Sequence, residues 1–387
     1  MHWRSKLIHP GAHAPANFRS LSIPTYRGST VLFERQADVS DDWRQREFGY
    51  SYGLYGTPTV LELGARIAEI EGAHHSFVVP GGQAAISLIY LAFCGSGAHA
   101  LVPQTAYGPN RELAAGLLQR LGISVESYDP LIGAGIADLI RTNTALIWLE
   151  SPGSITMEVQ DVPAIVAAAR TFNVPVALDN TYAAGVLFDA FAHGVDVSMQ
   201  ALTKYVGGHS DLLLGTVSVA GAGAYAAIGS AYKQLGMAVS PDDCSLALRG
   251  LQTLGIRLER LEKTTLDVAR WLARHPNITT VLHPALESCP GHEHWRRDFT
   301  GSSSIFSIVF DVRFTAAQVM TFADRLTLFK IGFSWGGVTS LVVAYPNLDR
   351  PGRNYDDRLV RLNIGLEETS DLIADLTQAL DAMETSA

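Results

Sequence analysis

The residue whose type and setting most suggest chemistry is Lys204. It lies in "ALTKYVGGHSD", residues 201–211, among small, hydroxylated and glycine residues. A lysine in a tight, partly apolar turn loses solvation, either because it pairs with a carboxylate or because it serves as a nucleophile of lowered pKa. The stretch alone does not separate these two uses, and an isolated lysine of this kind is more often structural.

Two further stretches carry groups that can bind an ionised ligand. "VPGGQAAIS" places Gly82 and Gln83 where a strand should give way to a helix, and free backbone N–H groups suit a phosphate there, although a lone Gly-Gly pair is more often a plain turn. "VALDNTYAAG" ends a hydrophobic strand on Asp179, which either caps a turn or holds a proton on a buried cationic heterocycle. A phosphate cradle, a strand-end aspartate and a strand-end lysine together are what pyridoxal 5′-phosphate requires.

The elements that must position these groups alternate along the chain. Apolar residues at helical spacing predict helices, and short continuous apolar runs predict strands that are buried on both faces. Such an alternation implies a parallel sheet covered by helices on both sides, with ligands bound at the carboxyl ends of its strands. The predicted helices span residues 59–73, 81–93, 109–122 and 162–173, and the predicted strands span residues 75–80, 99–104, 123–129, 145–151 and 174–180.

The pattern changes twice along the chain. The first fifty or so residues are irregular and contain several prolines, which predicts an extended N-terminal arm over residues 1–56. From about Arg249 a long charged helix is followed by strands such as "SSIFSIVFDV". We therefore predict a ligand-binding domain over residues 57–248 and a smaller α+β domain over residues 249–387.

Composition excludes several classes of partner. The 29 basic and 38 acidic residues give a formal net charge of −9 without any basic block, which argues against binding to nucleic acid or to an anionic membrane. The three cysteines show no C-x-x-C spacing, so we expect reduced thiols, a cytoplasmic location and no metal site. The N-terminus lacks the apolar core of a signal peptide. Residues 212–232 are uncharged and long enough to span a bilayer, but glycines in the middle favour a strand, a turn and a helix start.

Six longer motifs turn these separate signals into a family resemblance. The chain resembles the Cys/Met-metabolism family of pyridoxal-phosphate enzymes from about Tyr50 to its C-terminal end, and within that family the bacterial cystathionine β-lyase branch. The resemblance implies the fold type I, aminotransferase-like α/β architecture: a mostly parallel seven-stranded sheet in a large cofactor domain, and a smaller α+β C-terminal domain. The motifs that carry the resemblance are "LESPGSITMEVQDVPAIVAAAR", "LDNTYAAGVLF", "TKYVGGHSD", "RDFTGSSSIFS", "FSWGG" and "VRLNIGLEE".

The resemblance assigns the cofactor-binding roles. It implies that Lys204 forms the Schiff base with the cofactor and moves protons during the reaction, and that Asp179 keeps the ring nitrogen protonated. Tyr107, in "PQTAYGPN", matches the catalytic aromatic residue that stacks on the cofactor ring. The positions that hold the phosphate match Gly82 and Gln83 through their N–H groups and Thr203 through its hydroxyl.

The resemblance also assigns substrate-binding and intersubunit roles. Arg361 matches the arginine that grips the substrate α-carboxylate, and Ser334 and Trp335 match residues that line the same pocket. Tyr52 resembles a catalytic tyrosine that reaches the phosphate of a neighbouring subunit, which implies at least a dimer and, by family resemblance, a homotetramer. Leu54 stands where the family usually carries a phosphate-binding arginine, so we expect looser cofactor binding or a substitute cation.

The implied activity is cleavage of an amino-acid thioether. Within the resemblance, "ESPGSITMEV" and "FSWGG" favour the β-lyase reaction, which converts L-cystathionine to L-homocysteine, pyruvate and ammonia in methionine biosynthesis. The alternatives are a γ-synthase or γ-lyase on the same machinery, a broad cysteine-S-conjugate β-lyase or cysteine desulfhydrase, and a cofactor-free regulator on the same fold. The joint presence of Lys204, Asp179 and Arg361 argues against the regulator.

Overall fold

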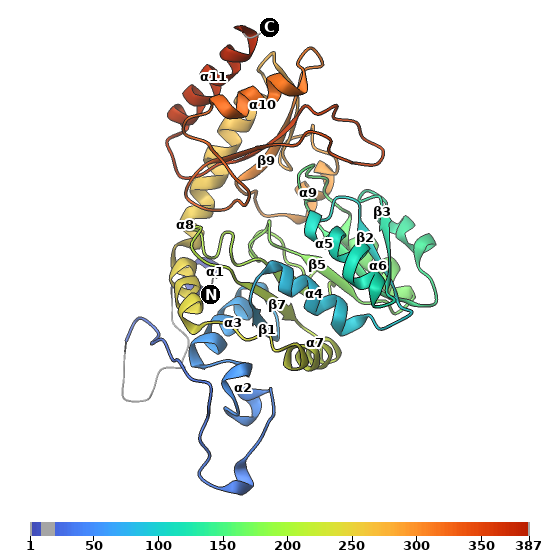
Figure 1. The fold of residues 1–387 in the computed structure, drawn as a ribbon, viewed down its shortest axis with the longest axis vertical. Helices are drawn as coiled ribbons and strands as arrows, with labels where there is room; N and C mark the ends of the chain where they lie inside the picture. The colour runs from blue at the N-terminus through green and yellow to red at the C-terminus, as the bar shows by residue number, and fades with distance from the viewer. Residues whose placement is uncertain (1, 9–19, 386–387) are drawn as a thin grey trace.

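The computed structural model describes residues 2–8 and 20–385, and its larger part is built on a seven-stranded sheet (Figure 1). The strand order is β1-β7-β6-β5-β4-β2-β3, and only the pairings that involve β7 are antiparallel. The predicted mostly parallel sheet of seven strands is therefore confirmed. The strands are β1 (His75–Val79), β2 (His99–Pro103), β3 (Ser124–Tyr128), β4 (Thr144–Glu150), β5 (Val176–Asp179), β6 (Val197–Gln200) and β7 (Gly215–Val219).

Helices cover both faces of this sheet. Along β4, Leu146 and Trp148 join the apolar core beneath α4 and α7, whereas Ile147 and Leu149 join the core beneath α6. This alternation explains why the strand reads as a continuous apolar run, because both of its faces are buried. The covering helices are α3 (Pro58–Glu71), α4 (Gly82–Phe93), α5 (Gly108–Leu113), α6 (Val162–Thr171), α7 (Ala222–Leu235) and α8 (Pro241–Leu272), with a π-helical turn η3 (Ala114–Leu118) after α5 and a 3₁₀ segment η4 (Gly133–Leu139).

Local sequence signals set the helix ends. α3 has a proline at its start and ends before Gly72, whose left-handed conformation (φ 71°) terminates the helix. The stretch 212–232 forms β7 and the start of α7, as predicted. None of the helices described by the structure is long and apolar enough to cross a membrane.

The long helix predicted from about Arg249 begins earlier, at Pro241. Its N-terminus is fixed by the hydroxyl of Ser240, which accepts a hydrogen bond from the backbone N–H of Asp242, and by the acidic residues of its first turn. The first half of α8 packs beside α3, and its last turns join the core of the C-terminal part. One continuous helix thus connects both parts, and we propose the division near residues 248 and 249 within it.

The C-terminal part is smaller and contains a second sheet, in the order β10-β11-β12-β9-β8. Its apolar core lies between this sheet, the end of α8 and two helices, α10 and α11. A capping box between Thr315 and Gln318 starts α10. The elements are β8 (Ile278–Leu282), α9 (His292–Asp298), β9 (Ile305–Phe310), α10 (Ala316–Arg325), β10 (Lys330–Ile331), β11 (Leu341–Ala344), β12 (Leu359–Asn363) and α11 (Thr369–Thr385).

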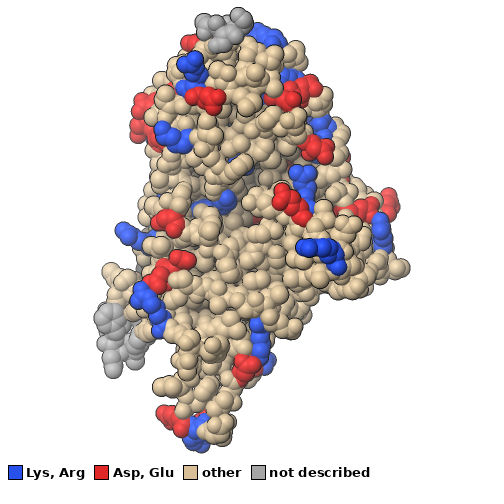
Figure 2. All heavy atoms as spheres, viewed as in Figure 1, with Lys and Arg blue, Asp and Glu red and all other residues tan. Residues whose placement is uncertain are grey.

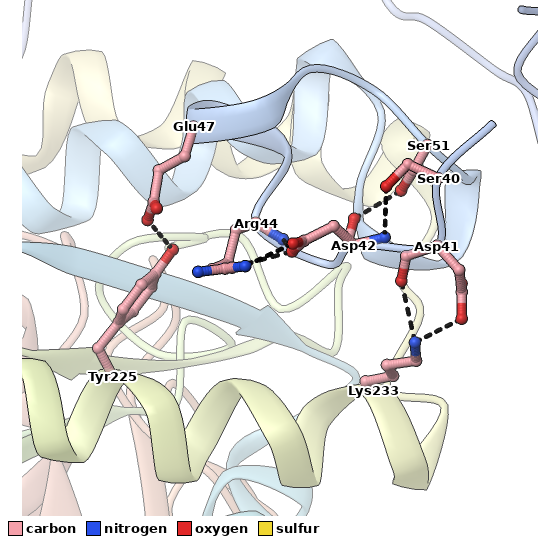
Figure 3. A network of polar contacts seen from close by, with 8 residues as sticks. All are labelled: Ser40, Asp41, Asp42, Arg44, Glu47, Ser51, Tyr225 and Lys233. Atoms are coloured by element: carbon pink, nitrogen blue, oxygen red, sulfur yellow. Dashed lines mark hydrogen bonds and ion pairs between the residues drawn. The ribbon is translucent and has the colours of Figure 1, made fainter. Parts of the chain in front are cut away.

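In the N-terminal arm, residues 2–8 lie against α3 and α8, whereas the segment that begins at residue 20 extends away from the body and returns to contact α7 (Figure 1). The regular pieces of the arm are short: α1 (Trp3–Lys6), η1 (Gln36–Asp38), α2 (Gln45–Phe48) and η2 (Gly53–Tyr55). Polar contacts attach the arm to α7, because Lys233 bonds the carboxylate of Asp41 and the Tyr225 hydroxyl donates to Glu47 at 2.8 Å (Figure 3). The ring of Trp43 packs on the same helix against Tyr225.

Charges of both signs are interspersed on the face shown in Figure 2.

Candidate active site

A cavity of about 410 Å³ opens at the carboxyl ends of β4, β5 and β6, next to the start of α4. This is the edge at which an open parallel sheet places its ligands. Residues of the C-terminal part close the cavity from the other side, including Trp335 and Arg361. The sequence-predicted residues found in the cavity wall are Gly82, Gln83, Tyr107, Asp179, Thr203, Lys204, Trp335 and Arg361.

One end of the cavity is shaped for a phosphate. The start of α4 supplies the backbone N–H groups of Gly82 and Gln83, and no side chain caps this helix end. A Cβ at Gly82 would lie 2.9 Å from the Cβ of Ala201, so only glycine lets the helix start approach the end of β6 so closely. The backbone of Leu214 holds the Thr203 hydroxyl beside this end of the cavity. The hydroxyl donates a hydrogen bond to the Leu214 carbonyl and accepts one from the Leu214 N–H.

Lys204 lies in the wall of the cavity. Its Nζ donates to the Ser334 hydroxyl at 2.8 Å and sits 5.4 Å from the centroid of the Trp335 ring. Burial, assisted by the positive charge of Arg361 and opposed by the charge of Asp179, lowers the pKa of Lys204 to about 8. An amine with this pKa exchanges protons easily near neutral pH, as a nucleophile or a base must.

Asp179 ends β5, and its carboxylate accepts a hydrogen bond from the backbone N–H of Thr181 at 3.0 Å. Burial raises the pKa of Asp179, while the bonds from Thr181 and the nearby Lys204 act in the opposite direction. The Thr181 hydroxyl in turn accepts from the N–H of Ala201 at 2.9 Å, which ties the end of β5 to the turn that carries Lys204.

Glu150 is a second carboxyl in this wall, in addition to the site residues predicted from the sequence. It ends β4 and accepts a hydrogen bond from the backbone N–H of Tyr107 at 2.7 Å. Burial and the charge of Asp179 raise the pKa of Glu150 well above its usual value. Glu150 could have been predicted from the sequence, because it lies near the end of a predicted strand, as Asp179 does. Thr181 was missed as well, although it lies two positions after Asp179.

Arg361 reaches the cavity from β12. Its guanidinium is 5.4 Å from the centroid of the Tyr345 ring, and burial lowers its pKa. Among the described residues, none forms a hydrogen bond or an ion pair with this guanidinium. A buried cation with free donors that faces a cavity suits an anionic ligand such as a carboxylate.

Two predicted site residues lie outside the cavity wall. Ser334 does not line the cavity itself but contacts Lys204 through its hydroxyl, from a backbone with φ 89°. Tyr52 lies on the arm, is 45% exposed and contacts Tyr55 rather than the cavity. Leu54 is half-buried on the same segment. Among the described residues, the cations of the cavity wall are Lys204 and Arg361, and neither lies on the arm.

The residues present fit pyridoxal phosphate. The glycine-dependent cradle suits its phosphate, the buried carboxyl of Asp179 suits its ring nitrogen, and the amine of Lys204 suits its aldehyde. In the described chain, no group of three or more histidine, cysteine, aspartate or glutamate residues is placed to hold a metal ion.

The fold and the site define a pyridoxal-phosphate-dependent enzyme of fold type I. Residues 4–381 match the model of the Cys/Met metabolism PLP-dependent enzyme family, and the chain belongs to this family. It is 41% identical to the cystathionine β-lyase MetC of Escherichia coli K12 over 382 residues, 96% of each chain. It is also 40% identical to a cystathionine β-lyase of Haemophilus influenzae over 381 residues, 95% of each chain.

A solved structure supports the same fold. The crystal structure of a cystathionine γ-synthase from Xanthomonas oryzae pv. oryzae in complex with cystathionine matches with a TM-score of 0.91 and 26% identity over 100% of both chains. The predicted family and fold class are confirmed by these similarities.

Proposed function

We propose that this protein is a carbon–sulfur β-lyase that hydrolyses L-cystathionine to L-homocysteine, pyruvate and ammonia, a step of methionine biosynthesis. The observation that carries the proposal is that Lys204 shares one cavity wall with Arg361 and Asp179, with its pKa lowered to about 8. Relatives of about 40% identity that are named cystathionine β-lyases support this choice over the γ-type reaction.

Each side chain of the site has a role in this reaction. Pyridoxal phosphate supplies an electron sink for the pair left on Cα when its proton is removed. The free guanidinium of Arg361 binds the substrate α-carboxylate and thereby orients Cα toward Lys204. Lys204 takes the Cα proton and returns a proton to the departing sulfur, so that the thiol leaves neutral. Ser334 holds the Lys204 amine in place by the 2.8 Å hydrogen bond.

Other residues hold the cofactor. Asp179 keeps the proton on the ring nitrogen, which maintains the electron sink. Tyr107 covers the ring, and its backbone is fixed by Glu150. The N–H groups of Gly82 and Gln83 and the hydroxyl of Thr203 bind the phosphate. Trp335 forms the wall beside Lys204 and excludes water from the amine.

The test is a product assay on the purified holoenzyme. Wild type should release pyruvate and homocysteine from L-cystathionine, and Lys204→Ala should release neither. Lys330→Ala, which removes an exposed lysine of β10, is the control and should keep wild-type activity. Formation of α-ketobutyrate in place of pyruvate would overturn the β-lyase proposal in favour of γ-chemistry.

We further propose a cytoplasmic homotetramer whose active sites are shared between subunits. Tyr52 is exposed and lies outside the cavity of its own chain, which supports a role in the site of a second copy. The decisive experiment mixes two inactive variants, Lys204→Ala and Tyr52→Ala, under conditions that exchange subunits. A hybrid dimer has one site free of both changes if Tyr52 acts across subunits, so activity should rise above the sum of the separate variants. If the activity of the mixture did not rise, Tyr52 would not act in the active site of a second subunit.

A further inference from the structure

The loop between β4 and α6 forms one wall of the cavity in an unusual conformation. Ile155 and Met157 both line the cavity, next to Ile305 and Trp335. Both have positive φ angles, 69° and 61°, a region that side chains adopt at a cost, above all β-branched ones such as isoleucine. Such backbone strain persists only where the surroundings hold it.

Backbone hydrogen bonds within the loop set its conformation, and the loop packs closely against Thr105 of the cofactor-binding part. The N–H of Gly153 donates to the carbonyl of Glu158 at 2.9 Å, and the N–H of Met157 donates to the carbonyl of Gly153 at 3.2 Å. A Cβ at Gly153 would lie 2.5 Å from the side chain of Thr105, so this position must be glycine. These bonds give the loop its shape but do not fix it relative to the C-terminal part.

The C-terminal part holds the carbonyls of the two strained residues. The hydroxyl of Ser307, on β9, donates to the carbonyl of Ile155 at 2.5 Å. The thiol of Cys289 donates to the carbonyl of Met157 at 3.1 Å. Both contacts come from residues more than a hundred positions away, so the wall depends on how the two parts pack.

A buried ion pair completes this attachment. Arg350 donates to a carboxylate oxygen of Glu158 at 3.1 Å, and the two side chains are 4% and 0% exposed. The same guanidinium donates to the side-chain oxygen of Gln104 at 2.8 Å. Arg353 lies 3.7 Å from Glu158 but is 38% exposed, so it contributes less. Arg350 therefore joins the segment after β11 to the loop and to the end of β2.

We propose that the Glu158–Arg350 pair positions the Ile155–Met157 wall, and that this wall selects the thioether chain of the substrate. The proposal rests on the proposed β-lyase function. The pair contributes little net stability compared with an apolar pair of similar size, because both charges are desolvated. It does fix the direction of the loop, through two donors of one rigid guanidinium. A shifted wall would misplace the long chain of cystathionine more than the single methyl of S-methyl-L-cysteine.

The test compares four holoenzyme variants: Glu158→Gln, Arg350→Met, the double variant, and the control Arg4→Met. Arg4 forms an ion pair with Glu259 at 2.8 Å, but both side chains are at least half exposed and neither lines the cavity. The readouts are the cofactor absorbance, the melting temperature, and the ratio of kcat/KM for L-cystathionine to kcat/KM for S-methyl-L-cysteine. The cofactor absorbance should be unchanged in all variants.

Both single variants should lower this ratio about tenfold and lower the melting temperature, because each leaves a buried group without its partner. The double variant should recover most of the melting temperature, since it removes the unpaired buried charge. It should keep the low ratio, since nothing then holds the loop in position. The control should retain both values.

Two outcomes would overturn the proposal. An unchanged ratio in the single variants would show that the wall does not depend on the pair. If the double variant recovered both the kcat/KM ratio and the melting temperature, the pair would contribute to stability only and would not position the wall. A wild type that makes no pyruvate from either substrate would instead overturn the proposed function, and with it the proposal for the Ile155–Met157 wall.

Discussion

Glu150 and Asp179 are directly paired residues at the ends of the neighbouring strands β4 and β5, and both carboxyls lie in the wall of one cavity. Burial raises the pKa of each, and the charge of Asp179 raises that of Glu150 further. Two like charges this close do not both ionise readily. Both carboxyls accept hydrogen bonds that lower the pKa, Asp179 from Thr181 and Glu150 from Tyr107. Because Lys204 lowers the pKa of Asp179 while the charge of Asp179 raises that of Glu150, we expect Glu150 to be the carboxyl that holds a proton.

This division of roles predicts different results for the two amide variants. Glu150→Gln replaces a neutral acid by a neutral amide that still accepts the bond from Tyr107, so kcat/KM should stay within about threefold of wild type. Asp179→Asn removes the charge that holds the ring proton and should lower kcat/KM at least about a hundredfold. Steady-state kinetics with L-cystathionine measures both. Equal losses in the two variants would show that Glu150 is ionised in the working enzyme.

The lowered pKa of Lys204 predicts the pH dependence of cofactor uptake. In the cofactor-free protein, attachment requires the unprotonated amine, whose fraction rises with pH through the pKa of about 8. The rate of uptake should therefore rise with a midpoint near pH 8, instead of near the usual 10.5. Absorbance after rapid mixing with pyridoxal phosphate measures it.

The charges near Lys204 predict the direction in which two variants should shift this midpoint. The positive charge of Arg361 lowers the pKa of Lys204, so Arg361→Met should move the midpoint upward. Asp179→Asn should move it downward, because that carboxylate raises the pKa. Equal midpoints in all three proteins would mean that burial alone sets the pKa.

Leu54 predicts a gain of function in cofactor binding. An arginine at this position would add a charge-assisted hydrogen bond to the phosphate from the arm of a second copy. Such a bond contributes about 1.5 to 3 kcal/mol, which corresponds to at least a tenfold lower Kd for pyridoxal phosphate. Equilibrium dialysis of Leu54→Arg against wild type measures the change, with Leu54→Met as the size-matched control. An unchanged Kd would show that the cradle at α4 binds the phosphate without any cation from the arm.

The sequence could predict those parts of the site that follow a strand or begin a helix. Asp179 and Gly82 lie at the end of β5 and the start of α4, whose apolar runs are unambiguous, and Lys204 follows β6 by four residues, so their convergence follows from the parallel sheet. Arg361 and Ser334 lie in the other part of the chain, and only the family resemblance indicated them. Local patterns do not reveal which residues meet across two parts, because that depends on tertiary packing.

The contacts that support the cavity wall could not be predicted from the sequence either, because they also depend on tertiary packing. The strain at Ile155 and Met157 and the pair of Glu158 with Arg350 depend on residues far apart in the chain. The path of the arm was equally unpredictable beyond its irregular composition, because its docking requires room at one helix position in addition to the polar contacts with α7.

That position is Gly229 of α7, against which the ring of Trp43 packs. A Cβ at Gly229 would overlap this ring, so Gly229→Val should displace Trp43 and release the arm. Partial loss of the Trp43 contacts should lower the free energy of unfolding by about 2 to 4 kcal/mol. The variant should also be cleaved faster by protease within residues 20–56.

Gly223 in the same helix provides the matched control. Nothing lies within 4 Å of a Cβ at this position, so Gly223→Val changes the helix without touching the arm. Limited proteolysis and thermal unfolding of both variants separate the two effects. If Tyr52 acts in the site of a second copy, Gly229→Val should also lose pyridoxal phosphate on dialysis, whereas Gly223→Val should retain it. Retention in both variants would mean that the docked arm does not hold the cofactor.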